Sequence, residues 1–190
     1  MTSISGQALN ELAAKIELCL FDVDGVLTDG RIVIGTDGQE FKFFDVQDGQ
    51  GVVMLGEFVE LGVITGRESD IVTNRMNQLG ITHVYQGQKN KLNAFQALLS
   101  KLGLSAESVC YVGDDLPDLA VMTKVGLPIA VANAVPAVKQ AALYCTQTSG
   151  GRGAVREVSE LILSAKGHLE TLVARSTDSS GSVDDGKTRA

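Results

Sequence analysis

The stretch LCLFDVDGVLTDG, residues 18–30, decides how the rest of the sequence is interpreted. Its first four residues are apolar and indicate a short buried strand. Asp22 and Asp24 follow one residue apart, and Gly25 then permits a sharp turn. Because side chains alternate along a strand, both carboxylates can point towards the same side. The sequence therefore places two like charges where a buried strand ends.

Apolar runs typical of strands alternate with amphipathic stretches along the chain. Strands are predicted over residues 17–23, 61–65, 82–87, 108–115, 127–133 and 143–147. Helices are predicted over residues 1–17, 49–60, 68–80, 90–103, 118–126, 135–142 and 154–167, the last with a continuation over 168–175. This alternation indicates an α/β fold in which helices cover both faces of a central parallel sheet. Asp37-Gly38, between two β-rich arms, predicts a hairpin over residues 31–44.

Length and composition limit the class of protein. The chain has 190 residues, of which 44% are hydrophobic, so we expect one domain over residues 1–175. The polar, Gly/Ser-rich residues 176–190 are predicted to be a disordered tail. The net charge of −7 argues against nucleic-acid binding, and no apolar run is long enough to span a membrane. The N-terminus lacks a signal-peptide pattern, which predicts a cytoplasmic protein.

Polar residues collect where the predicted parallel strands end, and these ends meet at one edge of a sheet. In chain order they are Asp22 and Asp24, then Thr65, Gly66 and Arg67, then Lys91, and finally Asp114, Asp115 and Asp118. Neighbouring carboxylates repel one another unless a cation or a proton intervenes. An oxygen-only ligand set favours Mg²⁺, and a lysine, a hydroxyl and a backbone N–H suit phosphoryl oxygens.

Each signal alone has an ordinary structural explanation. Aspartate pairs cap helices and form turns, a Thr-Gly pair is mostly a turn, and Lys91 could be a solvated helix residue. The ordered set at successive strand ends favours phosphoryl transfer. One of the two carboxylates Asp22 and Asp24 can then attack phosphorus while the other moves a proton.

The segments FDVDGVLTDG, VITGR, Lys91 and GDDLPD resemble, in this order, the four motifs of the haloacid dehalogenase superfamily of aspartate-nucleophile phosphatases. FFDVQDGQG, LGITHVYQGQKNK, YVGDDLPDL and GGRGAVREV are also similar to bacterial 3-deoxy-D-manno-octulosonate 8-phosphate (KDO 8-phosphate) phosphatases. The resemblance spans about residues 16–167. It implies a Rossmann-like fold with a protruding hairpin and no large cap domain.

The resemblance also implies roles for single residues. Asp22 is the expected nucleophile and Asp24 the general acid and base, with Thr65 and Lys91 holding the phosphoryl oxygens. Mg²⁺ is expected on Asp22, Asp114 and the backbone carbonyl of Asp24, with Asp115 or Asp118 in support. Expected substrate contacts are Asp24, Asp45, Val46, Gln47, Asp48, Gly49, Gly66, Arg67, Arg75, Lys91 and Arg152.

In such enzymes the hairpin packs against other subunits of a homotetramer, so that a neighbour covers each site. The many apolar side chains of residues 31–44 agree with this expectation, whereas the alternative is a hairpin folded onto its own domain. The glycine-rich segment before residue 154 is either a plain helix entry or an arm that carries Arg152 to the substrate.

Related enzymes commonly carry basic residues where Gln47 and Val53 stand. This departure concerns substrate contacts and leaves the nucleophile and metal site unaffected.

A phosphatase of a nine-carbon acid phosphate, such as an N-acylneuraminate or KDN 9-phosphate, would use the same core. A receiver-like phospho-switch is a second alternative, but it carries its acceptor on a later strand. A catalytically silent homologue would not need the intact Asp22, Asp24, Lys91 and Asp114.

Overall fold

A computed structural model describes residues 5–177 of the chain. Its centre is a parallel six-stranded sheet in the order β5-β4-β1-β6-β7-β8. The strands are β1 (Leu18–Phe21), β4 (Glu60–Ile64), β5 (His83–Tyr85), β6 (Val109–Gly113), β7 (Leu127–Ala130) and β8 (Tyr144–Cys145). Strand order reverses around β1, and such a reversal opens a crevice at the carboxyl ends of the strands.

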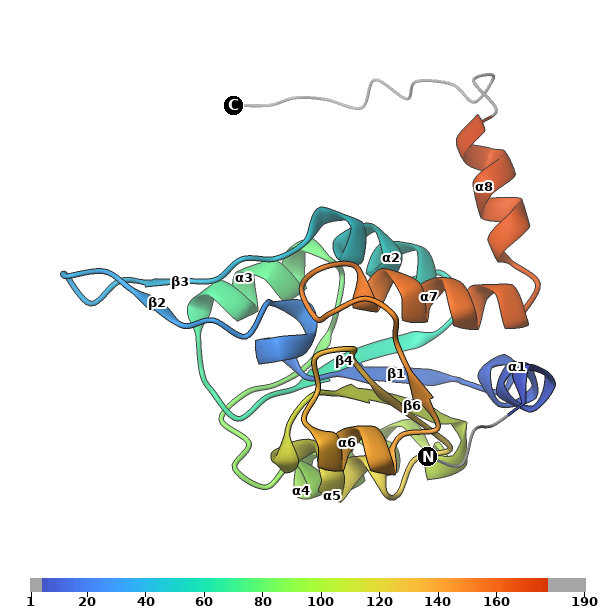
Figure 1. The fold of residues 1–190 in the computed structure, drawn as a ribbon, viewed down its shortest axis with the longest axis horizontal. Helices are drawn as coiled ribbons and strands as arrows, with labels where there is room; N and C mark the ends of the chain where they lie inside the picture. The colour runs from blue at the N-terminus through green and yellow to red at the C-terminus, as the bar shows by residue number, and fades with distance from the viewer. Residues whose placement is uncertain (1–4, 178–190) are drawn as a thin grey trace.

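Helices cover both faces of this sheet, which confirms the predicted fold class (Figure 1). One face carries α2 (Val46–Gly56), α3 (Asp70–Gln78) and α7 (Ala154–Ala165). The other carries α4 (Lys91–Leu102), α5 (Leu119–Met122) and α6 (Pro136–Ala141). Helix α1 (Gly6–Ala14) lies at the edge where β1 begins and packs against α7, and α8 (Leu169–Thr177) follows α7.

Local sequence explains where several helices start and stop. The Asn90 side chain accepts a hydrogen bond from the Leu92 N–H at 3.1 Å, and Gly103 ends α4 in the left-handed conformation. Gly167, with φ +76°, separates α7 from α8, so residues 168–175 do not continue α7. Helix α8 also includes residues 176 and 177, which were assigned to the tail; the rest of the predicted tail lies outside the described residues.

The predicted hairpin is present as β2 (Val33–Ile34) and β3 (Glu40–Phe41), an antiparallel pair closed at its base by a bridge between Thr28 and Phe44. Figure 1 shows it projecting away from the rest of the protein beside the turn that follows β1. Helix α2 begins at Val46, three residues earlier than predicted, because the Asp45 carboxylate caps its first turn. The residues between β1 and α2 thus form a hairpin and no larger cap.

The buried core consists mostly of side chains from the sheet and the helices packed on it. All four residues of β1 are fully buried, which requires the helices on both faces. Within residues 5–177, no helix is long and apolar enough to cross a membrane. The cytoplasmic location stays a prediction.

Candidate active site

The site forms where β1 and β6 end side by side. Their register pairs Phe21 with Val112, and the Asp22 N–H donates to the Val112 carbonyl at 3.0 Å. Asp22 and Asp114 therefore leave neighbouring strands at the same edge. The carboxylates of Asp22, Asp114 and Asp118 each offer an oxygen within 4.8 Å of the others. The structure thus brings together residues that lie almost a hundred positions apart.

A buried lysine links two of these carboxylates. Lys91, the first residue of α4, lies 2.8 Å from Asp22 Oδ1 and 2.7 Å from Asp118 Oδ1 through its Nζ. Its side chain is 3% exposed, so it is not the solvated helix residue that α4 alone would suggest. Burial by itself lowers the pKa of Lys91, but its attraction to Asp22 and Asp118 outweighs burial and raises it. Lys91 therefore stays charged.

Asp118 organises the loop after β6. It is fully buried and accepts hydrogen bonds from the Tyr111 hydroxyl at 2.8 Å and the Asp114 N–H at 2.9 Å, in addition to Lys91. Asp115, by contrast, is exposed and caps the next turn through the Leu116 N–H at 2.8 Å. Of the two expected supporting carboxylates, Asp118 is the one that contacts Lys91.

The carboxylates of Asp22 and Asp114 are held in an environment that disfavours their charge. Burial, opposed by Lys91 and reinforced by Asp118, raises the pKa of Asp22 to about 6. Burial and repulsion from Asp22 and Asp118 raise the pKa of Asp114 to about 7. Asp114 Oδ1 is also buried without a hydrogen-bond partner among residues 5–177. A buried oxygen without a partner, beside a second carboxylate whose pKa is also raised, fits a Mg²⁺ ion.

The turn Val23–Leu27 sets the approach to this cluster. Gly25 has φ +101°, and a Cβ there would lie 2.1 Å from Asp114 Oδ2, so only glycine fits. The buried Thr28 hydroxyl accepts from the Gly25 and Gly30 N–H groups at 3.3 and 3.2 Å. Asp29 lies 3.8 Å from Arg152 and 3.9 Å from Arg31, and so faces two cations at the hairpin base.

Asp24 lies on the rim, with its side chain 19% exposed. Its Oδ1 accepts a hydrogen bond from Lys42 on the hairpin, and Arg67 Nε lies 3.8 Å from its Oδ2. Of these two cations, the sequence analysis predicted Arg67 as a site residue, but not Lys42.

Thr65 is buried directly after β4, and its N–H donates to the Tyr85 carbonyl at 2.9 Å. Thr65 and Gly66 therefore begin the loop that leads to Arg67 at the same sheet edge.

The other expected substrate contacts separate into two groups. Asp45 and Arg152 line a cavity of about 400 Å³ at the hairpin base, and Gln47 and Arg152 line another of about 380 Å³ beside α7. Val46 is 80% exposed next to them. These positions remain open to a ligand.

Asp48 and Gly49 are buried and Arg75 is partly buried, and all three contact other parts of the protein, so their role as substrate contacts stays a prediction. The buried Asp48 carboxylate accepts from the Arg156 N–H at 2.8 Å and the Gly153 N–H at 3.2 Å, and so caps α7. Arg75 lies over the Phe44 ring at 5.8 Å, and a Cβ on Gly49 would meet Arg75 Nη2 at 2.4 Å. These residues hold α2, α3 and α7 together.

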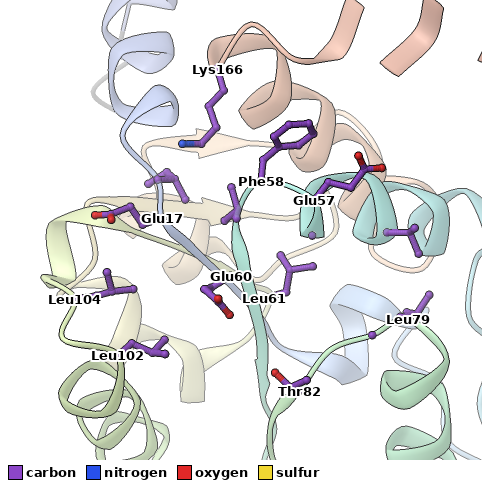
Figure 2. Close-up of a pocket in the computed structure, with 15 residues that line it drawn as sticks. Glu17, Glu57, Phe58, Glu60, Leu61, Leu79, Thr82, Leu102, Leu104 and Lys166 are labelled. Atoms are coloured by element: carbon purple, nitrogen blue, oxygen red, sulfur yellow. The ribbon is translucent and has the colours of Figure 1, made fainter. Parts of the chain in front are cut away.

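A larger cavity, of about 690 Å³, lies at the opposite edge of the sheet (Figure 2). Its lining includes Glu17 and Glu60, next to the first residues of β1 and at the start of β4, together with Phe58 and Lys166. Asp22 and Thr65 follow the other ends of the same two strands. Cavity size therefore does not locate the chemistry in this fold.

A Rossmann-like sheet whose first strand ends in a carboxylate, beside a buried lysine and a second acidic loop, has the groups that an aspartate-nucleophile hydrolase needs. The chain belongs to the haloacid dehalogenase-like hydrolases, since the family model of that description matches residues 63–158. This confirms the family predicted from the four motifs.

Within this family, the chain is similar to several phosphatases of known sequence or structure. The chain is 53% identical over 159 residues to the 3-deoxy-D-manno-octulosonate 8-phosphate phosphatase KdsC of Escherichia coli, covering 83% of this chain and 85% of the relative. A YrbI family phosphatase from Pseudomonas syringae is 48% identical with a TM-score of 0.88, covering 90% and 97% of the two chains. The Moraxella catarrhalis KDO 8-phosphate phosphatase, solved with magnesium, phosphate and KDO, is 41% identical with a TM-score of 0.88, covering 90% and 99%.

The raised pKa values of Asp22 and Asp114 predict how pH and metal act on stability. A carboxylate whose folded pKa lies above its unfolded value costs stability as pH rises. Without metal, the free energy of unfolding should therefore fall between about pH 4 and pH 7 through these two groups. At pH 8, saturating Mg²⁺ should raise Tm by about 5–10 °C. Thermal melts with EDTA or Mg²⁺ at several pH values measure both effects.

Asp114→Asn should remove most of the Mg²⁺ response. Asp115→Asn is the matched control, because Asp115 is exposed, lies one residue away and caps a turn that asparagine also caps. Equal Mg²⁺ responses in the two variants would contradict the assignment of Asp114 as a metal ligand.

Proposed function

We propose that this protein is a Mg²⁺-dependent phosphatase that hydrolyses 3-deoxy-D-manno-octulosonate 8-phosphate to KDO and phosphate through an aspartyl-phosphate on Asp22. The main observation is the pairing of Asp22 with the buried Lys91 at 2.8 Å, next to Asp114 and Asp118. The identity to KdsC over most of both chains supports the sugar-acid substrate.

In the first step, an oxygen of Asp22 attacks phosphorus, and the bond between phosphorus and the sugar oxygen breaks. Asp24 gives a proton to the departing sugar oxygen, which leaves as an alcohol. Lys91 and the Thr65 hydroxyl hold the phosphoryl oxygens, and the fixed charge of Lys91 offsets the negative charge that collects there.

In the second step, a water molecule attacks the phosphorus of phospho-Asp22 and gives a proton to Asp24. The bond between phosphorus and the Asp22 oxygen breaks, and inorganic phosphate leaves. Asp24 thus acts as acid and then as base, and the site returns to its starting state. This double use requires Asp24 to lie on the rim, as its partial exposure allows.

Asp22, Asp114 and the backbone carbonyl of Asp24 would hold Mg²⁺, with Asp118 anchoring their loop. When bound, the ion neutralises the carboxylates and the phosphate oxygens. Lys91 and Asp118 keep the Asp22 carboxylate oriented, and the buried β1 fixes its backbone. Because the Asp22 carboxylate is already oriented before the substrate reacts, it needs little reorganisation during the reaction.

The sugar acid would lie at the hairpin base, in the cavity that Asp45 and Arg152 line. Arg31 and Arg152 offer cations there for a carboxylate, and Arg67 lies 3.8 Å from Asp24 Oδ2. Gly66 and Gln47 complete the proposed contacts.

A substrate panel tests this function. We expect phosphate release in Mg²⁺ with kcat/KM at least about tenfold higher for KDO 8-phosphate than for N-acylneuraminate 9-phosphate or KDN 9-phosphate, a preference of about 1.4 kcal/mol. A preference for a nine-carbon acid would assign the protein to that class of phosphatase. Failure to release phosphate from any sugar-acid phosphate would contradict the proposal.

We also propose a homotetramer assembled through residues 31–44. Ile32, Ile34, Phe41 and Phe43 are 45–66% exposed, an apolar surface that a projecting hairpin does not cover by itself. Light scattering at micromolar concentration should give the mass of four chains. A monomeric mass for the unaltered protein would contradict this proposal.

The double variant Ile34→Lys/Phe43→Lys should dissociate the tetramer and reduce activity. Val173→Lys is the matched control, because Val173 is 52% exposed on α8, away from the hairpin. Dissociation by the control to the same extent would show that the hairpin is not the specific contact.

A further inference from the structure

The acid–base carboxylate of Asp24 is one of four charged side chains that form a closed ring with Glu40, Lys42 and Arg67. Lys42 donates to Asp24 Oδ1 and lies 3.5 Å from Glu40 Oε1. Arg67 donates from Nη2 to the same Glu40 oxygen at 3.0 Å, and its Nε lies 3.8 Å from Asp24 Oδ2. The ring thus alternates in charge and joins the hairpin, the turn after β1 and the loop after β4.

The side chain of Lys42 is buried in an otherwise exposed part of the chain. Its side chain is 1% exposed, while its neighbours Phe41 and Phe43 are 45% and 61% exposed. A lysine loses hydration when it is buried, so this position is stable only because Asp24 and Glu40 pair with the ammonium. The alternation of the hairpin arm directs Lys42 inward to the site and the two aromatic side chains outward.

The ring restrains the two oxygens of Asp24 unequally. Oδ1 is held by a hydrogen bond to Lys42, whereas Arg67 lies beyond hydrogen-bond distance from Oδ2. A carboxylate fixed at one oxygen keeps its other oxygen in one direction. That second oxygen remains available to the leaving group and to water, and correct placement of an acid is a large part of its effect.

We propose that Lys42, anchored by Glu40, is a positioning residue that aims Asp24 Oδ2 at the leaving oxygen, so that the hairpin controls the proton-transfer step. This inference rests on the proposed role of Asp24 as general acid. Because the same hairpin carries the exposed apolar side chains, its packing against neighbouring subunits would set the ring as well. Subunit assembly and acid–base chemistry are then coupled through three residues, Glu40, Lys42 and Arg67.

The dependence on the leaving group tests this inference. KDO 8-phosphate loses an alcohol that needs a proton, whereas p-nitrophenyl phosphate loses an anion that does not. Lys42→Met should lower kcat/KM for KDO 8-phosphate at least about tenfold through kcat, with KM changed little, because a displaced acid loses part of its usual contribution of about 10²–10⁴-fold. For p-nitrophenyl phosphate, kcat/KM should change less than about threefold.

Three further variants make the test specific. Lys101→Met, an exposed lysine on α4, should leave both substrates unaffected. Glu40→Gln should shift the two substrates in the same unequal way as Lys42→Met, by a smaller factor, and it keeps the volume of the side chain. Light scattering and thermal melts of each variant separate this effect from loss of assembly or folding.

The variant Asp24→Asn separates two hypotheses: that Lys42 positions Asp24, and that Asp24 is the general acid. The comparison uses kcat/KM, which reports the steps up to formation of the aspartyl-phosphate and not its hydrolysis. If Asp24→Asn spares kcat/KM for p-nitrophenyl phosphate and lowers kcat/KM for KDO 8-phosphate, the acid role holds, and equal losses of kcat/KM on both substrates in folded Lys42→Met and Glu40→Gln would then overturn the inference alone. If Asp24→Asn does not distinguish the substrates, the proposed acid role itself is wrong. A rise in KM without loss of kcat in Lys42→Met would identify Lys42 as a substrate contact and also overturn the inference.

Discussion

Asp22→Asn should reduce phosphate release from KDO 8-phosphate by at least about 10⁴-fold, because loss of a covalent nucleophile costs up to about 10⁶-fold. The amide has the shape of the carboxylate but cannot form the aspartyl-phosphate. The fold should survive, since β1 is fully buried by apolar residues that the change does not touch. Steady-state phosphate release with Mg²⁺, combined with a thermal melt, measures both parts.

Asp22→Ala provides a second variant that cannot regain a carboxylate by deamidation. Asp70→Asn is the matched control, because Asp70 is an exposed carboxylate in the first turn of α3, and it should keep full activity. Substantial turnover by either Asp22 variant would mean that another group attacks phosphorus.

Lys91→Met should damage both stability and catalysis. It leaves Asp22 and Asp118, both buried, without the ammonium that lies 2.8 and 2.7 Å from them. Removing one partner of a buried ion pair costs about 3–5 kcal/mol, so denaturant unfolding without metal should show a loss of about 3 kcal/mol or more. Turnover with Mg²⁺ should fall at least about 10²-fold, as expected for the loss of one fixed charge beside the phosphoryl group.

Lys89→Met is the matched control for this change, since Lys89 lies two residues away and is exposed. Its stability should change by no more than about 0.5 kcal/mol. If Lys91→Met were as stable as Lys89→Met without metal, the ion pairs of Lys91 would not hold the site together. If it kept full activity, its proposed contact with phosphate would be wrong.

Much of the fold follows from patterns that the sequence carries locally. The buried strand before Asp22, the Asn90 cap and Gly103 stop of α4, and the acidic loop after β6 are short-range signals, and the structure has each of them. Parallel strands meet at one edge, so residues at their ends could be assigned to one site before any coordinates were known. Asp22, Lys91, Asp114 and Asp118 do converge there.

Long-range packing explains what the sequence did not predict. Asp48 caps α7 more than a hundred residues further along the chain, and no local pattern distinguishes this from a substrate contact. Arg75 is held by Phe44 and Gly49, from other elements. Lys42 looked like a hairpin residue, because nothing in its own segment shows that the arm folds against Asp24. A lysine flanked by two apolar residues in a hairpin arm was the available signal.

The covalent intermediate tests the central claim most directly. Asp24→Asn, mixed briefly with p-nitrophenyl phosphate and Mg²⁺ and quenched in acid, should gain the mass of one phosphoryl group, because this leaving group needs no acid while loss of the base slows hydrolysis of the aspartyl-phosphate. Peptide mapping should place that group on Asp22, and Asp22→Asn treated in the same way should gain none. An Asp24→Asn protein that turns over substrate without ever carrying phosphate, or that carries it on a peptide lacking Asp22, would contradict the account.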